Sequence, residues 1–264
     1  MAFETEWLDL REPSDVAARD PGLRGAALAF LEAKPNPLVV DLGAGTGSTM
    51  RAFEALPVRW RLIDNDTVLL GEARARGGAH VETVEHDLAD IDALPLDGAR
   101  LVTASALFDL AGPDWIDALA DRLERSGIGL YAALSYDGVL EWQPADGDDL
   151  TARDAFNRHQ RGDKGFGPAL GPFAAAYLAD AMRKRGYAVS VASSPWTLGP
   201  EEKALQDALV KGIADAASDA GMHGAHHWHD RRIAQSGRAT CVVGHLDVLA
   251  LPRSQSKMIS VDSP

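Results

Sequence analysis

The segment that most constrains the fold is the stretch 39–48, with the sequence VVDLGAGTGS. Two valines lead into an acid, and glycines follow at every second position, at Gly43, Gly45 and Gly47. This pattern predicts a buried parallel strand that ends in a glycine-rich turn and continues into a helix. Because glycine has no Cβ, it accepts positive φ angles and lets a ligand approach the backbone. We therefore expect a nucleotide-like cofactor at this turn.

The spacing of the glycines distinguishes between two kinds of cofactor. A dinucleotide site follows the pattern G-x-G-x-x-G, in which a small last residue lets the helix pack on the strand. Counted from Gly43, Ser48 stands at that last position, and Gly47 comes one residue early. The observed order, an acid at Asp41 followed by G-x-G-x-G, resembles motif I of the class I S-adenosylmethionine (SAM) methyltransferases.

A second acid follows at the distance that a ribose contact requires. The apolar stretch 60–63 ends at Asp64, which lies 17 residues after Gly47. A carboxylate about 20 residues after the glycine turn can accept hydrogen bonds from both ribose hydroxyls. The resemblance assigns Asp64 and the adjacent Asn65 to this end of the cofactor, with Asp66 as the alternative acid.

The next two predicted strands also end on candidate site residues. The stretch 81–88 closes on Asp87 and Leu88, which the resemblance assigns to the adenine amino group and the ring edge. The stretch 101–110 resembles the fourth strand and its exit, where the methyl group meets the acceptor. It lacks the Asn/Asp-Pro-Pro-aromatic tetrapeptide of members that methylate exocyclic amino groups. The cofactor-binding residues that the resemblance implies are Asp41, Gly43, Ala44, Gly45, Gly47, Asp64, Asn65, Asp87, Leu88 and Ser105.

Alternating strand and helix patterns predict the fold class. We expect an α/β fold with a doubly wound, mostly parallel seven-stranded sheet, helices on both faces and an antiparallel last strand. A chain of 264 residues with 46% hydrophobic content can form one domain, here 1–252. Helices are expected within 1–36, with Ser14-Asp15 as an N-cap, and a disordered tail over 253–264. Further helices are predicted at 48–56, 67–76, 113–125, 173–185 and 201–220, and further strands at 128–135, 187–197 and 239–251.

Composition narrows the class of substrate. The chain has 26 Lys and Arg against 39 Asp and Glu, a net charge of −13, and no basic stripe, so we do not expect nucleic-acid binding. A single cysteine, Cys241, and the lack of a signal-peptide pattern or of an 18-residue apolar run predict a cytoplasmic protein without membrane contact. We expect a small-molecule substrate; the oligomeric state does not follow from the sequence.

Two segments, 136–172 and 199–236, are predicted as insertions that cap the substrate. In the first, His159 and Tyr136 are candidate catalytic residues because both can transfer protons. Arg158, His159 and Arg161, together with Phe108, are predicted to bind an anionic or polar acceptor; the alternative is that the insertion carries them as exposed helix residues.

The second insertion holds a histidine cluster. Four of the eight histidines lie within 223–229, and His227 is the other candidate base. A metal site of His223, His227 and Asp230 is an alternative. Gly224 weakens a helix at this point, however, and a plain surface role is also open. We expect no metal.

These features together predict an enzyme. It would transfer the methyl group of SAM to an oxygen, nitrogen or carbon of a small molecule by in-line displacement, in which orientation of the reactants is the main contribution. Two other hypotheses stay open. An NAD-dependent oxidoreductase would share the first strand and the acid after the second, and a non-catalytic SAM-binding protein would serve as a partner or regulatory subunit.

Overall fold

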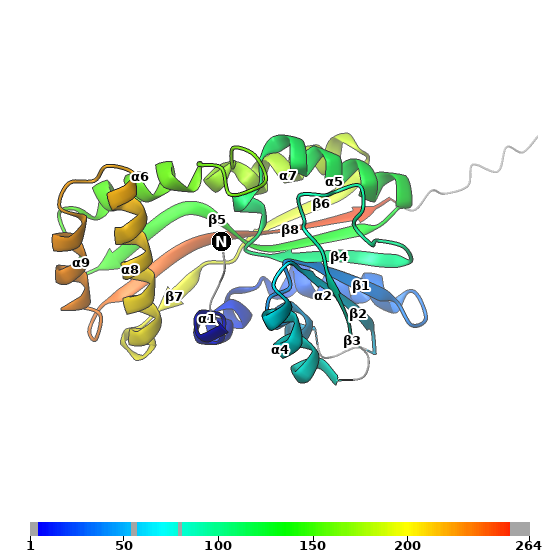
Figure 1. Ribbon diagram of the computed structural model, residues 1–264, viewed down its shortest axis with the longest axis horizontal. Helices are drawn as coiled ribbons and strands as arrows, with labels where there is room; N and C mark the ends of the chain where they lie inside the picture. Colours follow the sequence, from blue (N-terminus) through cyan, green and yellow to red (C-terminus); the bar gives the residue numbers. More distant parts are fainter. Residues whose placement is uncertain (1–4, 54–56, 79–80, 254–264) are drawn as a thin grey trace, which may run out of the picture.

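The computed structural model describes residues 5–53, 57–78 and 81–253, so the tail predicted to be disordered lies, from residue 254 on, outside the described residues. The helices are α1 (Thr5–Ala18), α2 (Pro21–Glu32), α3 (Ser48–Ala52), α4 (Thr67–Gly77), α5 (Pro113–Ser126), α6 (Asp149–Gln160), α7 (Ala174–Lys184), α8 (Lys203–Asp219) and α9 (Ala225–Ile233) (Figure 1). The strands are β1 (Leu38–Leu42), β2 (Arg59–Asp64), β3 (Val81–Glu85), β4 (Ala99–Ser105), β5 (Gly129–Gln143), β6 (Tyr187–Ser193), β7 (Trp196–Leu198) and β8 (Thr240–Pro252).

The strands form one sheet in the order β3-β2-β1-β4-β5-β8-β6. The pairs from β3 to β5 are parallel, and β8 runs antiparallel to both of its neighbours, β5 and β6. The predicted fold class, with its antiparallel last strand, is confirmed. The described sheet differs in having eight strands, because the segment predicted as one strand over 187–197 divides into β6 and the short β7, which pairs only with β8.

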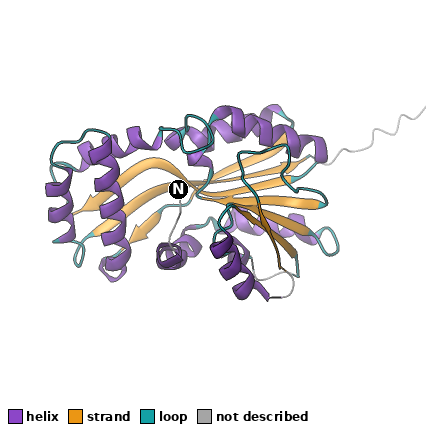
Figure 2. Cartoon of the chain, viewed as in Figure 1, coloured by secondary structure: helices purple, strands orange, loops and turns teal. Residues whose placement is uncertain are grey.

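Helices cover both faces of the sheet, as Figure 2 shows. All five residues of β1 are buried, and they alternate between two cores. Val40 and Leu42 pack in the core that α5 and α7 cover, whereas Val39 packs in the core that α2 and α4 cover. Burial on both faces fixes the strand, and with it the position of the glycine turn at its carboxyl end.

β5 and β8 are much longer than the parallel strands and extend the sheet into a second half, which we call the wing. The sequence predicts that the strand ends near Ser135 and that an insertion follows; this is wrong, because β5 continues to Gln143. Its distal half pairs with the start of β8, with Leu140 opposite Val243. Two register shifts interrupt the pairing, and Gly138 takes a φ of 94° there. This irregularity obscures the alternating pattern of the strand in the sequence.

Helices α6, α8 and α9 cover the wing at the end of the molecule away from α4 (Figure 1). A buried ion pair joins α9 to α6, in which Arg232 Nε donates to Asp149 Oδ1 at 2.8 Å. Trp228 Nε1 donates to the same oxygen at 2.9 Å, and the Trp228 ring packs on Trp142 of β5. None of the described helices is both long and apolar enough to span a membrane.

The amino-terminal helices differ from the prediction at their boundary. Ser14 and Asp15 lie inside α1, which begins at Thr5, and are not its N-cap. The cap residue is Asp20, whose carboxylate accepts from the backbone N–H of Leu23 at the start of α2. Asp15 instead pairs with Arg11 one helical turn earlier and lies buried in the interior of the protein.

Candidate functional site

The glycine turn adopts the conformation that its sequence predicts. Gly43, Gly45 and Gly47 have φ angles of 64°, 52° and 83°, a region that other residues rarely occupy. The backbone N–H of Gly45 donates to Asp64 Oδ2 at 2.8 Å, which ties the turn to the end of β2. α3 begins at Ser48, as predicted, and its described part ends at Ala52.

A cavity of about 650 Å³ lies at the carboxyl ends of β1 to β4. This is the edge of an open α/β sheet where ligands bind, and the volume is that of a small-molecule site. Residues from six separate segments line it. They are Leu8, Arg11, Gly43, Gly45, Asp64, Asn65, Asp66, Thr67, Leu69, Asp87, Leu88, Ser105, Ala106, Leu107, Leu110, Lys164, Gly165 and Phe166.

Most residues that the sequence assigns to the cofactor meet in this cavity: Gly43, Gly45, Asp64, Asn65, Asp87, Leu88 and Ser105. Ala44 lines a smaller adjoining cavity of about 50 Å³. Gly47 precedes α3 as its N-cap residue, and Asp41 lies beneath the turn with 1% of its surface exposed.

Asp64 and Asp66 make different hydrogen bonds, which indicate different roles. Asp66 Oδ1 accepts from the backbone N–H groups of Val68 and Leu69, so Asp66 acts as the N-cap of α4. Asp64 connects the glycine turn to Asp66, because its other oxygen, Oδ1, accepts from the backbone N–H of Asp66 at 3.0 Å. Each carboxylate oxygen has a further lone pair for a ligand hydroxyl. The geometry favours Asp64 over Asp66 as the acid that faces a ribose.

A buried acid and a buried arginine lie behind the smaller cavity. Asp41 Oδ1 accepts from Thr103 Oγ1 at 2.6 Å, and burial raises the pKa of the Asp41 carboxyl to about 7. Arg19 is 3% exposed and donates through one terminal nitrogen to Ser105 Oγ at 3.1 Å and to Thr49 Oγ1 at 3.4 Å. Arg19 Nε, Arg19 Nη1 and Asp41 Oδ2 have no hydrogen-bond partner among the described residues. Such unpaired groups are costly to bury, which suggests that a ligand completes them.

The sequence does not single out Arg19. It lies at the junction of α1 and α2, which the Asp20-Pro21 pair marks as a helix start. No local pattern, however, connects this junction with Ser105, which is 86 positions away in the chain. Only the folded chain brings the two together.

α1 closes the cavity over the glycine turn. A Cβ on Gly45 would lie 3.2 Å from Leu8 Cδ1 of this helix. Two ion pairs hold α1 against the cofactor side of the protein: Arg51 Nε donates to Glu12 Oε1 at 2.6 Å, and Arg76 Nη2 donates to Asp9 Oδ2 at 3.1 Å. Leu8 and Arg11 therefore form part of the cavity wall.

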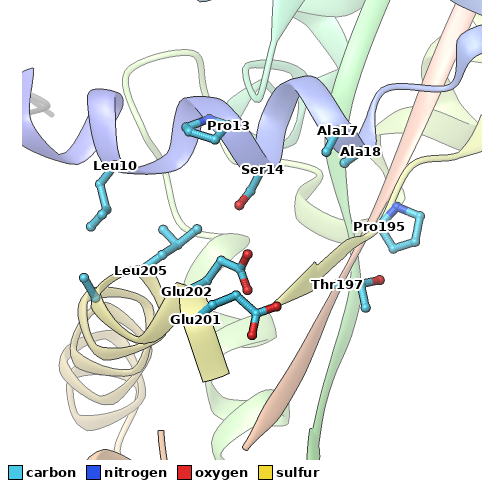
Figure 3. Close-up of a pocket in the computed structure, with 11 residues that line it drawn as sticks. Leu10, Pro13, Ser14, Ala17, Ala18, Pro195, Thr197, Glu201, Glu202 and Leu205 are labelled. Carbon is cyan, nitrogen blue, oxygen red and sulfur yellow. The ribbon is translucent and has the colours of Figure 1, made fainter. Parts of the chain in front are cut away.

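The opposite side of α1 lines a second cavity of about 440 Å³ (Figure 3). Leu10, Pro13 and Ser14 face it from α1, and the carboxylates of Glu201 and Glu202 face it from the start of the α8 region. Glu202 Oε2 already accepts from the backbone N–H of Gly199 at 2.7 Å. The glycine turn and the acids after β2 and β3 line the larger cavity, and for this reason we place the site there.

The residues predicted to bind or activate the substrate lie in several places. Tyr136 is buried in the wing and donates through its hydroxyl to Asn157 Oδ1 at 2.7 Å. His159 is half-buried and lies 3.4 Å from the ammonium of Lys164, which lines the cavity. Burial and Lys164 both lower the pKa of His159. His159 is thus one side chain away from the described cavity wall.

The other predicted substrate residues are outside the described lining of the cavity. Arg158 and Arg161 are exposed, and the Arg161 guanidinium lies 5.9 Å from the ring centre of Phe173. Phe108 packs in the core, with its ring centre 5.9 Å from that of Trp115. Its side chain is 1% exposed and belongs to the core that α5 and α7 cover.

The histidine cluster belongs to the wing. His227 is exposed on α9, which lies at the far end of the molecule from α4 and the glycine turn (Figure 1). Within the described residues, no group of three His, Cys, Asp or Glu side chains could hold a metal ion. The helix is anchored by Trp228, which lies between two of the histidines, and by Arg232 one turn later; both are buried. Because these two residues occupy the buried face of α9, histidines such as His227 occupy its exposed face.

No protein-family model matches the chain, and no curated protein matches it. Several solved structures are similar. Mycolic acid cyclopropane synthase CmaA1, solved with S-adenosylhomocysteine (SAH) and CTAB, has a TM-score of 0.51 and 12% identity over 87% of this chain and 83% of that one. The YcgJ protein of Bacillus subtilis has a TM-score of 0.50 and 12% identity over 88% and 99% of the two chains.

A SAM-dependent methyltransferase from Geobacter sulfurreducens, in complex with SAH, has 16% identity over 96% of this chain and 100% of that one, with a TM-score of 0.49. The two structures with the higher TM-scores are similar to this chain over most of its length. The chain has the class I SAM-methyltransferase fold. At these identities the likeness concerns the fold alone, and the predicted fold is confirmed.

Proposed function

We propose that the protein binds SAM and transfers its methyl group to a small-molecule acceptor, at an oxygen, nitrogen or carbon atom. The observation that carries this proposal is the meeting of the glycine turn, Asp64 and Asp87 in one cavity of about 650 Å³. The resemblance to the methyltransferases gives each of these residues a part in a SAM site. The similar structure of CmaA1, which was solved with SAH, supports the choice of cofactor.

The residues around the cavity fit the three parts of SAM. Asp64 would accept from the ribose hydroxyls, and Asp87 with the backbone of Leu88 would hold the adenine ring. The Leu88 carbonyl is already bonded to Trp115 Nε1 at 2.7 Å, which fixes this segment and leaves its N–H for the ligand. Leu88 and Leu107 lie next to Gly43 and provide an apolar surface for the ring.

The methionine part of SAM carries an ammonium and a carboxylate. After a small rotation of the side chains, Asp41 would pair with the ammonium and Arg19 with the carboxylate, which would satisfy the atoms that have no partner now. A dinucleotide has no such amino-acid group, and its pyrophosphate would approach Asp41 with a like charge. The buried acid and arginine thus favour SAM over NAD.

When bound, SAM supplies a methyl group on a positively charged sulfur, which is a good leaving group. The contribution of the chain is to orient that methyl toward the acceptor and to keep water out. α1 covers the turn through Leu8, and Phe166 closes the opposite wall of the cavity. His159, Tyr136, Arg158 and Arg161 remain candidates for the acceptor side, whereas the position of α9 gives His227 no part in this proposal.

Calorimetric titration of the purified protein with SAM, SAH and NAD tests the choice of cofactor. We expect SAM and SAH to bind and NAD not to bind; binding of NAD without SAH would refute the assignment. Incubation of a metabolite extract with methyl-labelled SAM then separates an enzyme from a non-catalytic binding protein. A labelled small product that requires the protein supports transfer, and its absence from extracts of the native host supports the binding role.

A further inference from the structure

Five buried aspartates occur in the described chain, and their hydrogen bonds divide them into two groups. In Asp15, Asp149 and Asp247, both carboxylate oxygens accept a hydrogen bond from a side chain. Asp41 and Asp109 each retain one oxygen without any partner. Both of these lie beside the proposed cofactor cavity. In the proposed function, the ammonium of SAM would pair with the unpartnered oxygen of Asp41, but no part of SAM would pair with that of Asp109.

Asp109 follows β4 and is adjacent in the chain to Leu110, a residue of the cavity wall. It belongs to the short 3-10 turn Phe108–Leu110 that follows β4, and two of its near neighbours in the chain, Leu107 and Leu110, line the cavity. Its carboxyl is 6% exposed, and Oδ1 has no partner among the described residues. Burial raises the pKa of Asp109 to about 6. Its ionised form is therefore a stronger base than an ordinary aspartate.

The surroundings of Asp109 suit a cation. The Arg11 guanidinium is close enough to lower the pKa of Asp109, and it lies 5.0 Å from the ring centre of Trp196 while it pairs with Asp15. The positive group already held here is the Arg11 guanidinium, which interacts with the carboxylates of Asp15 and Asp109 and with the electron-rich ring of Trp196. The His245 ring packs 5.3 Å from Trp196, and burial and Arg11 lower the pKa of His245 to about 3.

The cation that acts on Asp109 offers little to an anionic acceptor. Arg11 is already paired with Asp15, and a neutral His245 adds no charge. The groups that lower the pKa of Asp109 are the Arg11 guanidinium from α1 and the backbone N–H groups of Asp109 itself and of Tyr136 in β5, whereas the Tyr136 hydroxyl is bonded to Asn157. The His245 ring packs on those of Tyr136 and Trp196, and Arg11 lies over the Trp196 ring, so the cation that acts on Asp109 is in contact with a buried aromatic cluster.

We propose that Asp109 binds and deprotonates the acceptor, and that the acceptor is an amine attached to an aromatic or apolar group. This inference rests on the proposed function. The acceptor ammonium gives a proton to the Asp109 carboxylate and becomes a neutral amine. Its nitrogen lone pair forms the bond to the methyl carbon, while the carbon–sulfur bond breaks and its electrons stay on sulfur. The products are a methylated ammonium and SAH, and the proton leaves Asp109 for solvent.

A binding experiment tests this without turnover. The protein is saturated with SAH, and 2-phenylethylamine and 2-phenylethanol are titrated by calorimetry at pH 7.5 and pH 5.0. The amine stays an ammonium at both pH values, because its pKa is close to that of lysine. We expect the amine to bind at least about tenfold more tightly than the alcohol at pH 7.5. Its affinity should fall about tenfold at pH 5.0, where a carboxyl with a pKa of about 6 is mostly protonated.

Two variants provide the controls. Asp109→Asn should remove the pH dependence and most of the preference for the amine, whereas Asp114→Asn, at an exposed acid in the next helix, should leave both unchanged. Equal binding of amine and alcohol, or a pH dependence that persists in Asp109→Asn, would overturn the inference. A wild-type affinity for the amine that does not fall at pH 5.0 would also overturn the inference, and this outcome does not depend on the folding of Asp109→Asn. If SAH fails to bind, the proposed function fails first and this inference falls with it.

Discussion

The role of Arg19 gives the sharpest test of the cofactor site. Arg19→Met keeps the length of the side chain and removes the guanidinium, together with its two nitrogens that have no partner. The free protein should lose little stability, because the variant no longer buries an unpaired charge. Binding of SAH should suffer, since a hydrogen bond to a charged group contributes about 1.5–3 kcal/mol and a guanidinium can make two to one carboxylate.

We expect Arg19→Met to weaken SAH binding by about 2–4 kcal/mol, or about 30-fold to about 1,000-fold. Calorimetry with a second ligand isolates the cause. 5′-Methylthioadenosine has the adenine, ribose and thioether of SAH but no amino-acid group, so its affinity should be the same in the wild type and the variant. Asp64→Ala should instead weaken both ligands, by about 1.5–3 kcal/mol.

Arg24→Met is the matched control, because it makes the same change at a half-buried arginine of α2 that contacts Ala52 and not the cavity. It should leave both affinities unchanged. An equal loss of both ligands in Arg19→Met would refute the reasoning, since it would mean that Arg19 only supports the fold of the α1–α2 junction.

Three other predictions concern the turn, the wing and pH. Gly45→Val should abolish SAH binding in calorimetry, because a Cβ there meets Leu8 at 3.2 Å and φ is 52°; binding within a few-fold of wild type would contradict this. Arg232→Met should lower the free energy of unfolding in urea by about 3–5 kcal/mol, since it leaves Asp149 buried without its partner, and adding Asp149→Leu should restore much of the loss. Burial raises the pKa of Asp41 from 3.8 to about 7, so this group stabilises the fold fully below pH 3.8 and loses that contribution as pH rises through about 7. Wild type should therefore lose stability relative to Asp41→Asn between pH 5 and pH 8 in urea titrations, and parallel curves would speak against it.

The cofactor side of the site could be predicted because its signals are local. Glycines with positive φ must follow β1, and Asp64 and Asp87 each end a strand that the sequence identifies by its apolar residues. Parallel strands place their carboxyl ends at one edge, so the order of these acids along the chain translates directly into a common cavity.

The other residues proposed for the site, on its cofactor side and on its acceptor side, could not be predicted in the same way. Arg19, Asp109 and His245 lie far apart in the chain, and their significance comes from burial and missing partners, which only the folded protein reveals. The distal half of β5 was hidden for a different reason. Leu140 and Trp142 do alternate with polar residues. They follow the register shift and Gly138, however, and a glycine at this point of the sequence is typical of a loop.

The length of β5 and β8 has a consequence for how the protein can be divided. Leu140 to Gln143 and Thr240 to Val243 belong to the same two strands whose other ends lie in the middle of the parallel core. The helices of the wing cover side chains of these strands, among them Trp142 and Cys241, which are 3% and 0% exposed. Deleting α6, α8 and α9 would therefore leave two apolar, twisted strands projecting into water from an intact core. The wing is accordingly not a removable module, and exchanging acceptor specificity between proteins of this fold would require transfer of the helices together with the strands beneath them.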